Sequence, residues 1–342
     1  MLPYGILIEA VLVLILLVAV ANKNQAFLVN SQVEKSVAET IKWVDFNVSY
    51  EALCLAYEWD VKTHDTNWEV YWIDLLAYTA AKTGGVFEQK ALTLLDKVAR
   101  ELSSGETDME ELTKNMKYYD YYREAYAAVL GGMVGEYKIE VAGKAGEYET
   151  RYGLKAYFPL ARGFAYSHYD DFGAGRSYGY KRKHLGHDMM GQIGTPIIAV
   201  ESGVVEALGW NQYGGWRVGI RSFDGKRYYY YAHLRQNYPY AEGLEEGSVI
   251  TAGDVIGYMG HTGYSVEENV NNIDVTHLHW GLELIFDEKR REDGYEIWID
   301  IYPLTRFLEK HTQAAHKVEG TKEWVRSTDI IDPVVEEHLK KQ

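Results

Sequence analysis

The sequence predicts an α+β protein, in which an N-terminal apolar segment and a small all-α domain precede an antiparallel β-sheet domain. The chain has 342 residues, which is long enough for two domains and an anchor. Residues 1–150 contain 9 of the 32 glycines, and residues 4–158 contain no proline. The other 23 glycines and five of the six prolines follow residue 150. Because proline breaks a helix interior, we expect helices in the first half and short strands with tight turns in the second.

The N-terminal segment, residues 1–22, is directed to a membrane. Residues 2–21 carry one charge, Glu9, and are long enough to cross a bilayer core of about 30 Å. Residues 19–21, Ala-Val-Ala, have the form of a signal-peptidase site, so the segment could be a cleaved signal peptide. The absence of a preceding Lys or Arg instead favours a retained membrane anchor. Lys23 by itself favours the opposite topology, but both interpretations predict an extracytoplasmic protein, anchored or secreted.

Residues 31–140 are expected to form the helical domain. Apolar residues recur there at helical spacing and are interrupted by glycines that are typical of helix ends. The expected helices span residues 33–44, 68–82, 91–102 and 109–130. No motif assigns this domain a role or a protein partner, and its Tyr and Trp residues fit either a core or a binding groove.

Residues 150–305 are expected to form the β domain, because short apolar runs alternate there with glycines. Asp224-Gly225 lies between two of these runs and predicts a hairpin. Residues 306–342 form a charged C-terminal tail, which we expect to be helical or loosely ordered and which carries no recognisable chemistry.

Charge and cysteine content limit the function classes. The net charge is −15, and no block of Lys and Arg stands out, so a nucleic-acid partner is not expected. Cys54 is the only cysteine, so the chain has no intrachain disulfide. We expect Cys54 to be a buried small apolar residue.

Eleven histidines occur in the chain, and several lie in three motifs of the β domain. The first motif is HLGHD, from His184 to Asp188. On a strand, positions i and i+4 share a face, so His184 and Asp188 could reach one metal ion. His187 should then point to the opposite face. This spacing alone is weak evidence, because such pairs are usually only solvated.

The second and third motifs are YAHL, which contains His233, and HLHW, which contains His277 and His279. His233 ends the strand after the predicted hairpin, where a single histidine is more often structural. On a strand, His277 and His279 face the same way, about 7 Å apart. One could ligate a metal while the other stands beside a bound water.

Together the three motifs predict a zinc site. Catalytic zinc takes three protein ligands from His and carboxylate and keeps one position for water. His184, Asp188 and His279 supply such a set. No His-Glu-x-x-His occurs in the chain. His233 and His277 remain as proton-transfer groups, because imidazole titrates near the working pH.

The three motifs, in this order, resemble the lysostaphin and LytM-type zinc metalloendopeptidases. The resemblance covers roughly residues 155–300 and includes the stretches GTPIIAVESGVV and AGDVIGYMGHTGYS. It implies a LytM-like antiparallel β domain with a substrate groove walled by loops. It also implies one Zn²⁺ per chain, a peptidoglycan peptide as substrate and action at the cell wall.

Carried over residue by residue, the resemblance implies that His184, Asp188 and His279 bind zinc. His233 and His277 would act in catalysis, as base or as stabiliser of the tetrahedral oxyanion.

The same family uses a tyrosine shortly before the first histidine to steady the oxyanion, and Tyr178 and Tyr180 are the candidates here. The sequence departs from the family pattern at residues 266–276, where the family usually has only a few residues. This insertion would lengthen a loop at the groove rim and puts substrate preference in doubt, but it leaves the zinc ligands intact.

Two alternatives to an active peptidoglycan endopeptidase remain. A non-catalytic LytM-fold protein could be a scaffold, a channel component or an activator of another hydrolase, although such proteins commonly lack ligands that this chain retains. A wall hydrolase with chemistry in the helical domain could use Glu51 or Glu58 as a glycosidase acid. No partner carboxylate for either glutamate can be placed from sequence.

Overall fold

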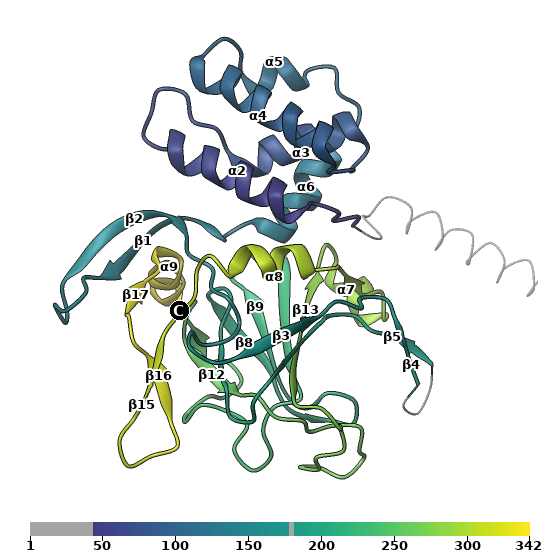
Figure 1. Cartoon of the computed structure of the whole chain (residues 1–342), viewed down its shortest axis with the longest axis vertical. Helices are drawn as coiled ribbons and strands as arrows, with labels where there is room; N and C mark the ends of the chain where they lie inside the picture. The colour runs from purple at the N-terminus through teal and green to yellow at the C-terminus, as the bar shows by residue number, and fades with distance from the viewer. Residues whose placement is uncertain (1–43, 178–180) are drawn as a thin grey trace, which may run out of the picture. The chain divides into compact units, whose positions relative to one another are not determined.

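The structure is a computed structural model that describes residues 44–177 and 181–342 (Figure 1). The predicted N-terminal segment, and all but the last residue of the helix predicted at 33–44, lie outside the described residues. Among the described residues, no helix is both long and apolar enough to cross a membrane. Residues 44–285 and 296–342 form one compact unit. Residues 286–295 belong to a second unit, in which Asp287 caps the short helix α7 (Glu288–Glu292).

Five helices follow one another in the first part of the large unit. Their bounds are α2 (Tyr50–Thr63), α3 (Trp72–Thr83), α4 (Gln89–Ser104), α5 (Met109–Thr113) and α6 (Tyr119–Leu130). The helices predicted at 68–82 and 91–102 are present with shifted ends. The helix predicted at 109–130 is two helices, because the chain turns between α5 and α6, where Met116 N–H donates to the carbonyl of Thr113. Helix α2 was not predicted, and Cys54 is buried in it, as expected.

Asp60 explains both the missed helix and the late start of α3. This carboxylate is buried on α2, where an apolar pattern would not place it. Its Oδ2 accepts from the backbone N–H of Trp72, and its Oδ1 accepts from the hydroxyl of Tyr152. The N-terminus of α3 is therefore fixed by a side chain from another helix, which a local sequence pattern cannot reveal.

A three-stranded sheet follows the helices, and it corrects two expectations. Its strands are β1 (Val134–Glu140), β2 (Tyr148–Leu154) and β17 (Ile330–Ile331), in the order β17-β1-β2. Residues 134–140, which were expected to end the helical domain, are therefore a strand. The C-terminal tail, which we expected to be helical or loosely ordered, also forms strands: β17 pairs with β1, and the buried Lys155 lies 2.8 Å from Asp332.

The main sheet is antiparallel and runs in the order β11-β8-β9-β10-β13-β6-β3, with β14 paired to β13. Its strands are β3 (Tyr166–Tyr169), β6 (His187–Gly191), β8 (Gly203–Asn211), β9 (Gly215–Ser222), β10 (Arg227–Ala232), β11 (Val249–Ile250), β13 (His277–Leu284) and β14 (Ile297–Trp298). The hairpin predicted at Asp224-Gly225 joins β9 to β10, and Gly225 has a φ of 74°. Strand β13 lies between β10 and β6, so both neighbours reach its histidines.

Several smaller strands and helices lie before, between and after the strands of this sheet in the sequence. They are β4 (Gly175–Arg176) paired with β5 (Arg182–Lys183), β7 (Pro196–Ile198) with β12 (Val255–Tyr258), β15 (Ala315–Lys317) with β16 (Trp324–Arg326), and the helices α8 (Tyr302–Leu308) and α9 (Pro333–Lys341). The family-like stretches before and after the central motif thus form β7, β8 and β12.

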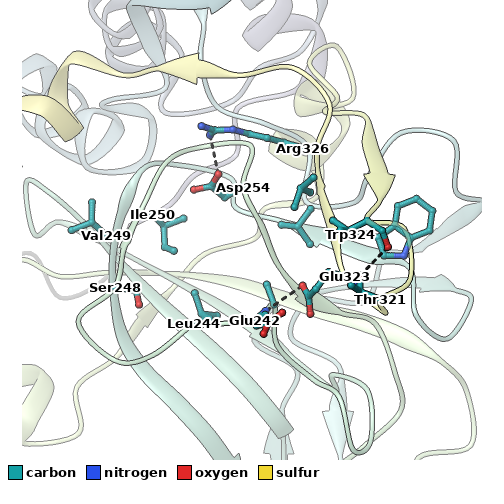
Figure 2. Close-up of a pocket in the computed structure, with 15 residues that line it drawn as sticks. Glu242, Leu244, Ser248, Val249, Ile250, Asp254, Thr321, Glu323, Trp324 and Arg326 are labelled. Carbon is teal, nitrogen blue, oxygen red and sulfur yellow. Dashed lines mark hydrogen bonds and ion pairs between the residues drawn. The ribbon is translucent and has the colours of Figure 1, made fainter. Parts of the chain in front are cut away.

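The β16 strand helps to line a hollow of about 720 Å³ (Figure 2). Glu323 accepts there from the hydroxyl of Tyr258 at 3.0 Å and from the backbone N–H of Glu242 at 3.2 Å. Arg326 forms an ion pair with Asp254 at 2.9 Å. The charged groups of this hollow thus fix the C-terminal hairpin, and none of the sequence-predicted site residues lines it.

A buried cation ties helix α6 to the main sheet. Arg227 of β10 is 1% exposed, and its guanidinium forms two hydrogen bonds with Glu201, at 2.7 and 3.0 Å. It also donates to the carbonyl of Ala128 in α6 at 3.0 Å and to Asp224 at 3.0 Å. Tyr229 donates to the same glutamate at 2.6 Å, so the buried charge is fully embedded in polar contacts.

Replacing Glu201 with Ala should lower the free energy of unfolding by about 3–5 kcal/mol, because the guanidinium of Arg227 would lose its buried counter-charge. Urea unfolding of the wild type and the variant measures the difference. Glu206→Ala is the matched control, because it breaks the Glu206–Arg221 pair near the surface and should cost less than about 1 kcal/mol. Equal losses of unfolding free energy in the two variants would show that the buried Arg227–Glu201 pair contributes no more to stability than the pair near the surface.

Candidate metal centre

Three of the predicted site residues meet at one point of the main sheet. Nε2 of His184 lies 3.0 Å from Oδ1 of Asp188 and 2.9 Å from Nδ1 of His279. The third side of the triangle, from Nδ1 of His279 to Oδ1 of Asp188, is also 2.9 Å. The three donor atoms thus form a nearly regular triangle, and His184 and Asp188 are buried.

The chemistry of this triangle fits zinc. Donors bonded to tetrahedral zinc at about 2.0–2.1 Å lie roughly 3.3 Å apart, close to the spacing seen here. Two imidazole nitrogens and one carboxylate oxygen are also the ligand types of catalytic zinc. When neither imidazole carries a proton on the nitrogen that faces this point, three lone pairs meet at one buried position, and one cation satisfies all three.

Strand register brings two residues of the triangle together. His279 of β13 stands directly opposite Asp188 of β6, and on its other side it stands opposite Ala232 of β10. Cross-strand partners in an antiparallel sheet have Cβ atoms about 4.5–5.5 Å apart, so their side chains meet on one face.

His184 reaches the same point by a route that the sequence did not indicate. It precedes β6 and lies outside any strand, so the i, i+4 strand argument gave the right partner for the wrong reason. Gly186 lies in the turn between His184 and β6. A Cβ at Gly186 would lie 2.5 Å from Cε1 of His279, so only glycine lets the turn approach this imidazole.

A second layer of charged groups surrounds the ligands, and sequence analysis did not identify it. Nδ1 of His184 lies 2.8 Å from Oδ1 of Asp171, within ion-pair distance but not aligned as a hydrogen bond. Arg176 lies 2.6 Å from Asp171 and 3.3 Å from Oδ2 of Asp188. Asp171 and Arg176 lie before the first motif, in a segment with no recognisable spacing, so no local signal points to them.

The two predicted catalytic histidines lie beside the triangle. The ring of His233 is 4.7 Å from the ring of His277 and 5.8 Å from the ring of His279, measured between centroids. Nε2 of His277 is 3.8 Å from Oδ2 of Asp188. The structure thus brings together all five histidine and aspartate residues that the three motifs singled out.

Backbone carbonyls fix the tautomers of these two histidines. Nδ1 of His233 lies 2.9 Å from the carbonyl of Thr262, and Nδ1 of His277 lies 2.8 Å from the carbonyl of Val275. A carbonyl can only accept, so each Nδ1 carries the proton and each Nε2 is a potential proton acceptor. His233 has a φ of 62°, an uncommon conformation for a residue other than glycine and one that is found at functional sites.

Burial and neighbouring groups determine which side chains of the site are charged. Burial lowers the pKa of His233 well below its usual value, and the neighbouring His277 and His279 lower it further. Burial would raise the pKa of Asp188, but hydrogen bonds with His184 and His279 outweigh that effect and hold the pKa far below the usual range. The site therefore contains a carboxylate and a neutral imidazole at neutral pH.

His187 points away from the triangle, as predicted. Its Nε2 lies 2.8 Å from Nδ1 of His168, whose Nε2 lies 2.9 Å from Glu309. Burial, together with the nearby His168, lowers the pKa of His187 to about 3. His187 is therefore a neutral structural residue behind the site.

The predicted oxyanion tyrosines, Tyr178 and Tyr180, lie outside the described residues. A different tyrosine lies near the histidines: the ring of Tyr264 is 6.1 Å from that of His233. The insertion at residues 266–276 is held by Asn269, whose side chain accepts from the indole N–H of Trp216 at 2.9 Å.

Among the described residues, one further group could hold a metal. His64, Asp65 and Glu69 lie close together, but Asp65 and Glu69 are exposed. Glu69 also accepts from the backbone N–H of Asp65 and from the hydroxyl of Tyr71. Exposed carboxylates that already accept hydrogen bonds form a weaker site than the buried triangle.

Comparisons with known proteins agree with this geometry. Residues 182–291 match the model of Peptidase family M23. The chain carries a peptidase family M23 domain. This matched range contains His184, Asp188, His233, His277 and His279.

Two curated relatives resemble the M23 domain. The L-Ala–D-Glu endopeptidase of Bacillus subtilis (strain 168) is 35% identical over 155 residues, which is 45% of this chain and 44% of that protein. Lysostaphin of Staphylococcus simulans is 35% identical over 89 residues, 26% of this chain and 17% of that protein. The chain therefore covers less than half the length of these relatives.

A crystal structure from Ruminococcus gnavus ATCC 29149, described as a candidate glycyl-glycine endopeptidase lytM, has a similar fold. It covers 80% of this chain and 92% of its own, with a TM-score of 0.53 and 24% sequence identity. The mixture of helices and antiparallel sheets is thus LytM-like, as predicted.

Replacing Asp171 with Ala should weaken zinc binding by the M23 domain about 10- to 100-fold, because the ligating His184 would lose the carboxylate at its Nδ1. Competition with a chromogenic zinc chelator measures the affinity. Asp170→Ala, one residue earlier in the chain, is the control and should change the affinity less than threefold. If both variants bind zinc as the wild type does, Asp171 does not orient the ligand.

Proposed function

We propose that the chain is a zinc-dependent endopeptidase that hydrolyses peptide bonds in bacterial peptidoglycan. The observation that carries the proposal is the buried triangle of His184, Asp188 and His279 beside two histidines with proton-accepting Nε2 atoms. The peptidase domain is proposed to span residues 150–305 and to bind one Zn²⁺. Membership of the M23 domain in a peptidase family supports the proposal.

The proposed ligands are Nε2 of His184, a carboxylate oxygen of Asp188 and Nδ1 of His279. Zinc held there would supply a Lewis acid for the scissile carbonyl and lower the pKa of a water molecule towards about 7. Asp171 and Arg176 orient the ligands: Asp171 contacts His184, and Arg176 contacts the oxygen of Asp188 that lies outside the triangle.

The proposed proton-transfer groups are His277 and His233. Nε2 of His277, beside Asp188, is placed to accept a proton from the attacking water and to pass it to the leaving amine. His233, kept neutral by burial, can accept a proton as base or stabilise the oxyanion once it is protonated. Both tautomers are set before substrate binds, so no reorganisation is needed for the transfer.

The proposed substrate is the peptide part of peptidoglycan. Relatives of the M23 domain are named as an L-Ala–D-Glu endopeptidase and as lysostaphin, and these names support a wall peptide. Extracytoplasmic action, anchored to a membrane or secreted to the cell wall, follows from that substrate. The alternative, a non-catalytic scaffold or activator with the same fold, predicts no turnover on any wall peptide.

Replacing His279 with Ala should abolish both zinc binding and turnover, whereas His277→Ala should retain stoichiometric zinc and lose turnover by more than about 100-fold. Zinc content by elemental analysis and release of amino groups from purified wall measure the two properties. Equal metal loss in both variants would mean that ligand and base are exchanged. His316→Ala, an exposed histidine outside the site, is the control and should change neither.

Purified peptidoglycan incubated with the full chain should release peptide fragments with new amino termini, and a zinc chelator should stop the release. Mass spectrometry of the products identifies the bond that is cut. Added zinc should restore the chelated enzyme. An intact wall after incubation with zinc-loaded protein would refute the enzymatic function and favour the scaffold, and shortened glycan chains would favour a glycosidase.

A further inference from the structure

We propose that the helical domain carries a carbohydrate-binding site, built on Trp68, that binds the glycan strand of peptidoglycan. No residue of the three histidine motifs lines this site, so it is distinct from the candidate metal centre. The choice of a glycan rests on the proposed function, in which the peptide part of the same polymer is cleaved. The sequence left open whether the Tyr and Trp residues of this domain form a core or a binding groove.

Some of these aromatic residues belong to the core, but two lie at the surface. Trp59, Trp72 and Tyr126 are buried. By contrast, Trp68 is 52% exposed and Tyr71 is 57% exposed, and both lie in the segment between α2 and α3. Two large aromatic side chains that stay exposed three residues apart indicate a surface that another molecule covers.

The two exposed rings line one hollow of about 210 Å³, which has room for a group the size of one sugar ring. Its apolar lining includes Val70, Leu102 and Met109. Its polar lining includes Asn67 and Asp108. Binding sites for small groups typically combine apolar walls with a few polar side chains that fix the orientation of the ligand. The hollow therefore has the composition of a ligand site.

The backbone at Gly105 holds one face of the Trp68 indole. A Cβ at Gly105 would lie 2.5 Å from Cε2 of Trp68 and 2.8 Å from both Nε1 and Cζ2. Such similar distances to three bonded atoms place Gly105 over the face of the ring and not at its edge. Gly105 follows α4 directly and has a φ of 74°, a conformation that favours glycine. The ring is thus positioned before a ligand binds, and its other face is the exposed one.

A ring held in this way suits a sugar. A pyranose has a face of C–H groups that packs on an aromatic ring, and its hydroxyls require hydrogen-bond partners at the rim. Asn67 is exposed and supplies an amide that both donates and accepts. Oδ1 of Asp108 accepts from the backbone N–H of Glu111 at 2.8 Å, and a carboxylate has about four acceptor positions, so Asp108 can also accept from a hydroxyl.

The carboxylates of the hollow favour a neutral sugar over a cation, although aromatic rings can bind either. Asp74 forms an ion pair with Arg123 at 2.7 Å. Glu69 accepts from the backbone N–H of Asp65 at 3.0 Å and from the hydroxyl of Tyr71 at 3.1 Å. Carboxylates that already have such partners attract a further cation weakly but still accept hydrogen bonds from hydroxyls.

The test measures binding of peptide-free sugars by titration calorimetry with the full chain. The probes are the tetrasaccharide of N-acetylglucosamine, glycan strands from which the peptides have been removed, and tetramethylammonium as a cation. A peptidase cannot cleave any of them, so binding is measured without turnover. The proteins are wild type, Trp68→Leu, Trp68→Phe and Tyr118→Leu. Tyr118 is the matched control, because it is an aromatic residue of the same domain that is 53% exposed and does not line the hollow.

We expect wild type to bind both sugars more tightly than tetramethylammonium. Trp68→Leu should weaken sugar binding about 10-fold or more, because leucine keeps apolar surface but loses the flat ring. Trp68→Phe should retain part of the affinity, and Tyr118→Leu should change it less than about twofold. The inference is overturned if wild type binds neither sugar, if Trp68→Leu and Tyr118→Leu lose affinity equally, or if tetramethylammonium binds more tightly and depends on Trp68.

Cleavage assays separate this inference from the proposed function. A soluble stem peptide contains no glycan, so zinc-loaded Trp68→Leu should cleave it with the kcat/KM of wild type. The same variant should release peptides from intact wall with a higher KM and an unchanged kcat. If wild type cleaves neither substrate, the proposed function fails, but sugar binding that depends on Trp68 still supports the carbohydrate site. If peptides are cleaved and no sugar is bound, only the carbohydrate site is refuted.

Discussion

The antiparallel pairing of β13 with β6, in the register that sets His279 opposite Asp188, is the constraint on which the rest of the site depends. A shift by one residue would turn His277 and His279 to the other face of the sheet and replace them with Leu278 and Trp280, which are fully buried there. The cost of removing these two side chains from their packing therefore also protects the position of His277 and His279. On the other edge of β13, pairing with β10 delivers His233 next to the same point.

Two glycines also position groups of the site, because the backbone passes close to its neighbours at each of them. Gly186 lets the turn that carries His184 pass beside His279, and Gly215 packs so tightly that a Cβ would lie 2.4 Å from the carbonyl carbon of Thr262, whose carbonyl oxygen orients His233. Each of these contacts holds a chemical group in place through the backbone rather than through a flexible side chain, as preorganised sites require. The close packing of the backbone around His233 thus places the carbonyl of Thr262 at its Nδ1 and also buries the imidazole, which keeps it neutral.

The three motifs combine chemically specific residue types, and the structure brings the five histidine and aspartate residues that they single out close together. The sequence predicted the β domain and the Asp224-Gly225 hairpin from local patterns, and it predicted that His187 faces away. It was not sufficient for features set by contacts distant in sequence. Asp60 caps α3 from another helix, β17 pairs with β1 almost 200 residues away, and Asp171 reaches His184 from an irregular segment. None of these interactions leaves a periodic or spaced pattern, so local reasoning extended the helical domain to residue 140 and predicted no strand after residue 306.

The role proposed for this site requires one cation in the triangle of His184, Asp188 and His279. The most direct measurement is anomalous diffraction at the zinc absorption edge from crystals of the full chain. We expect a single strong peak per chain at about 2.0–2.2 Å from Nε2 of His184, a carboxylate oxygen of Asp188 and Nδ1 of His279. A peak at His64, Asp65 and Glu69 alone, or crystals grown with zinc that show no peak at the triangle, would contradict it.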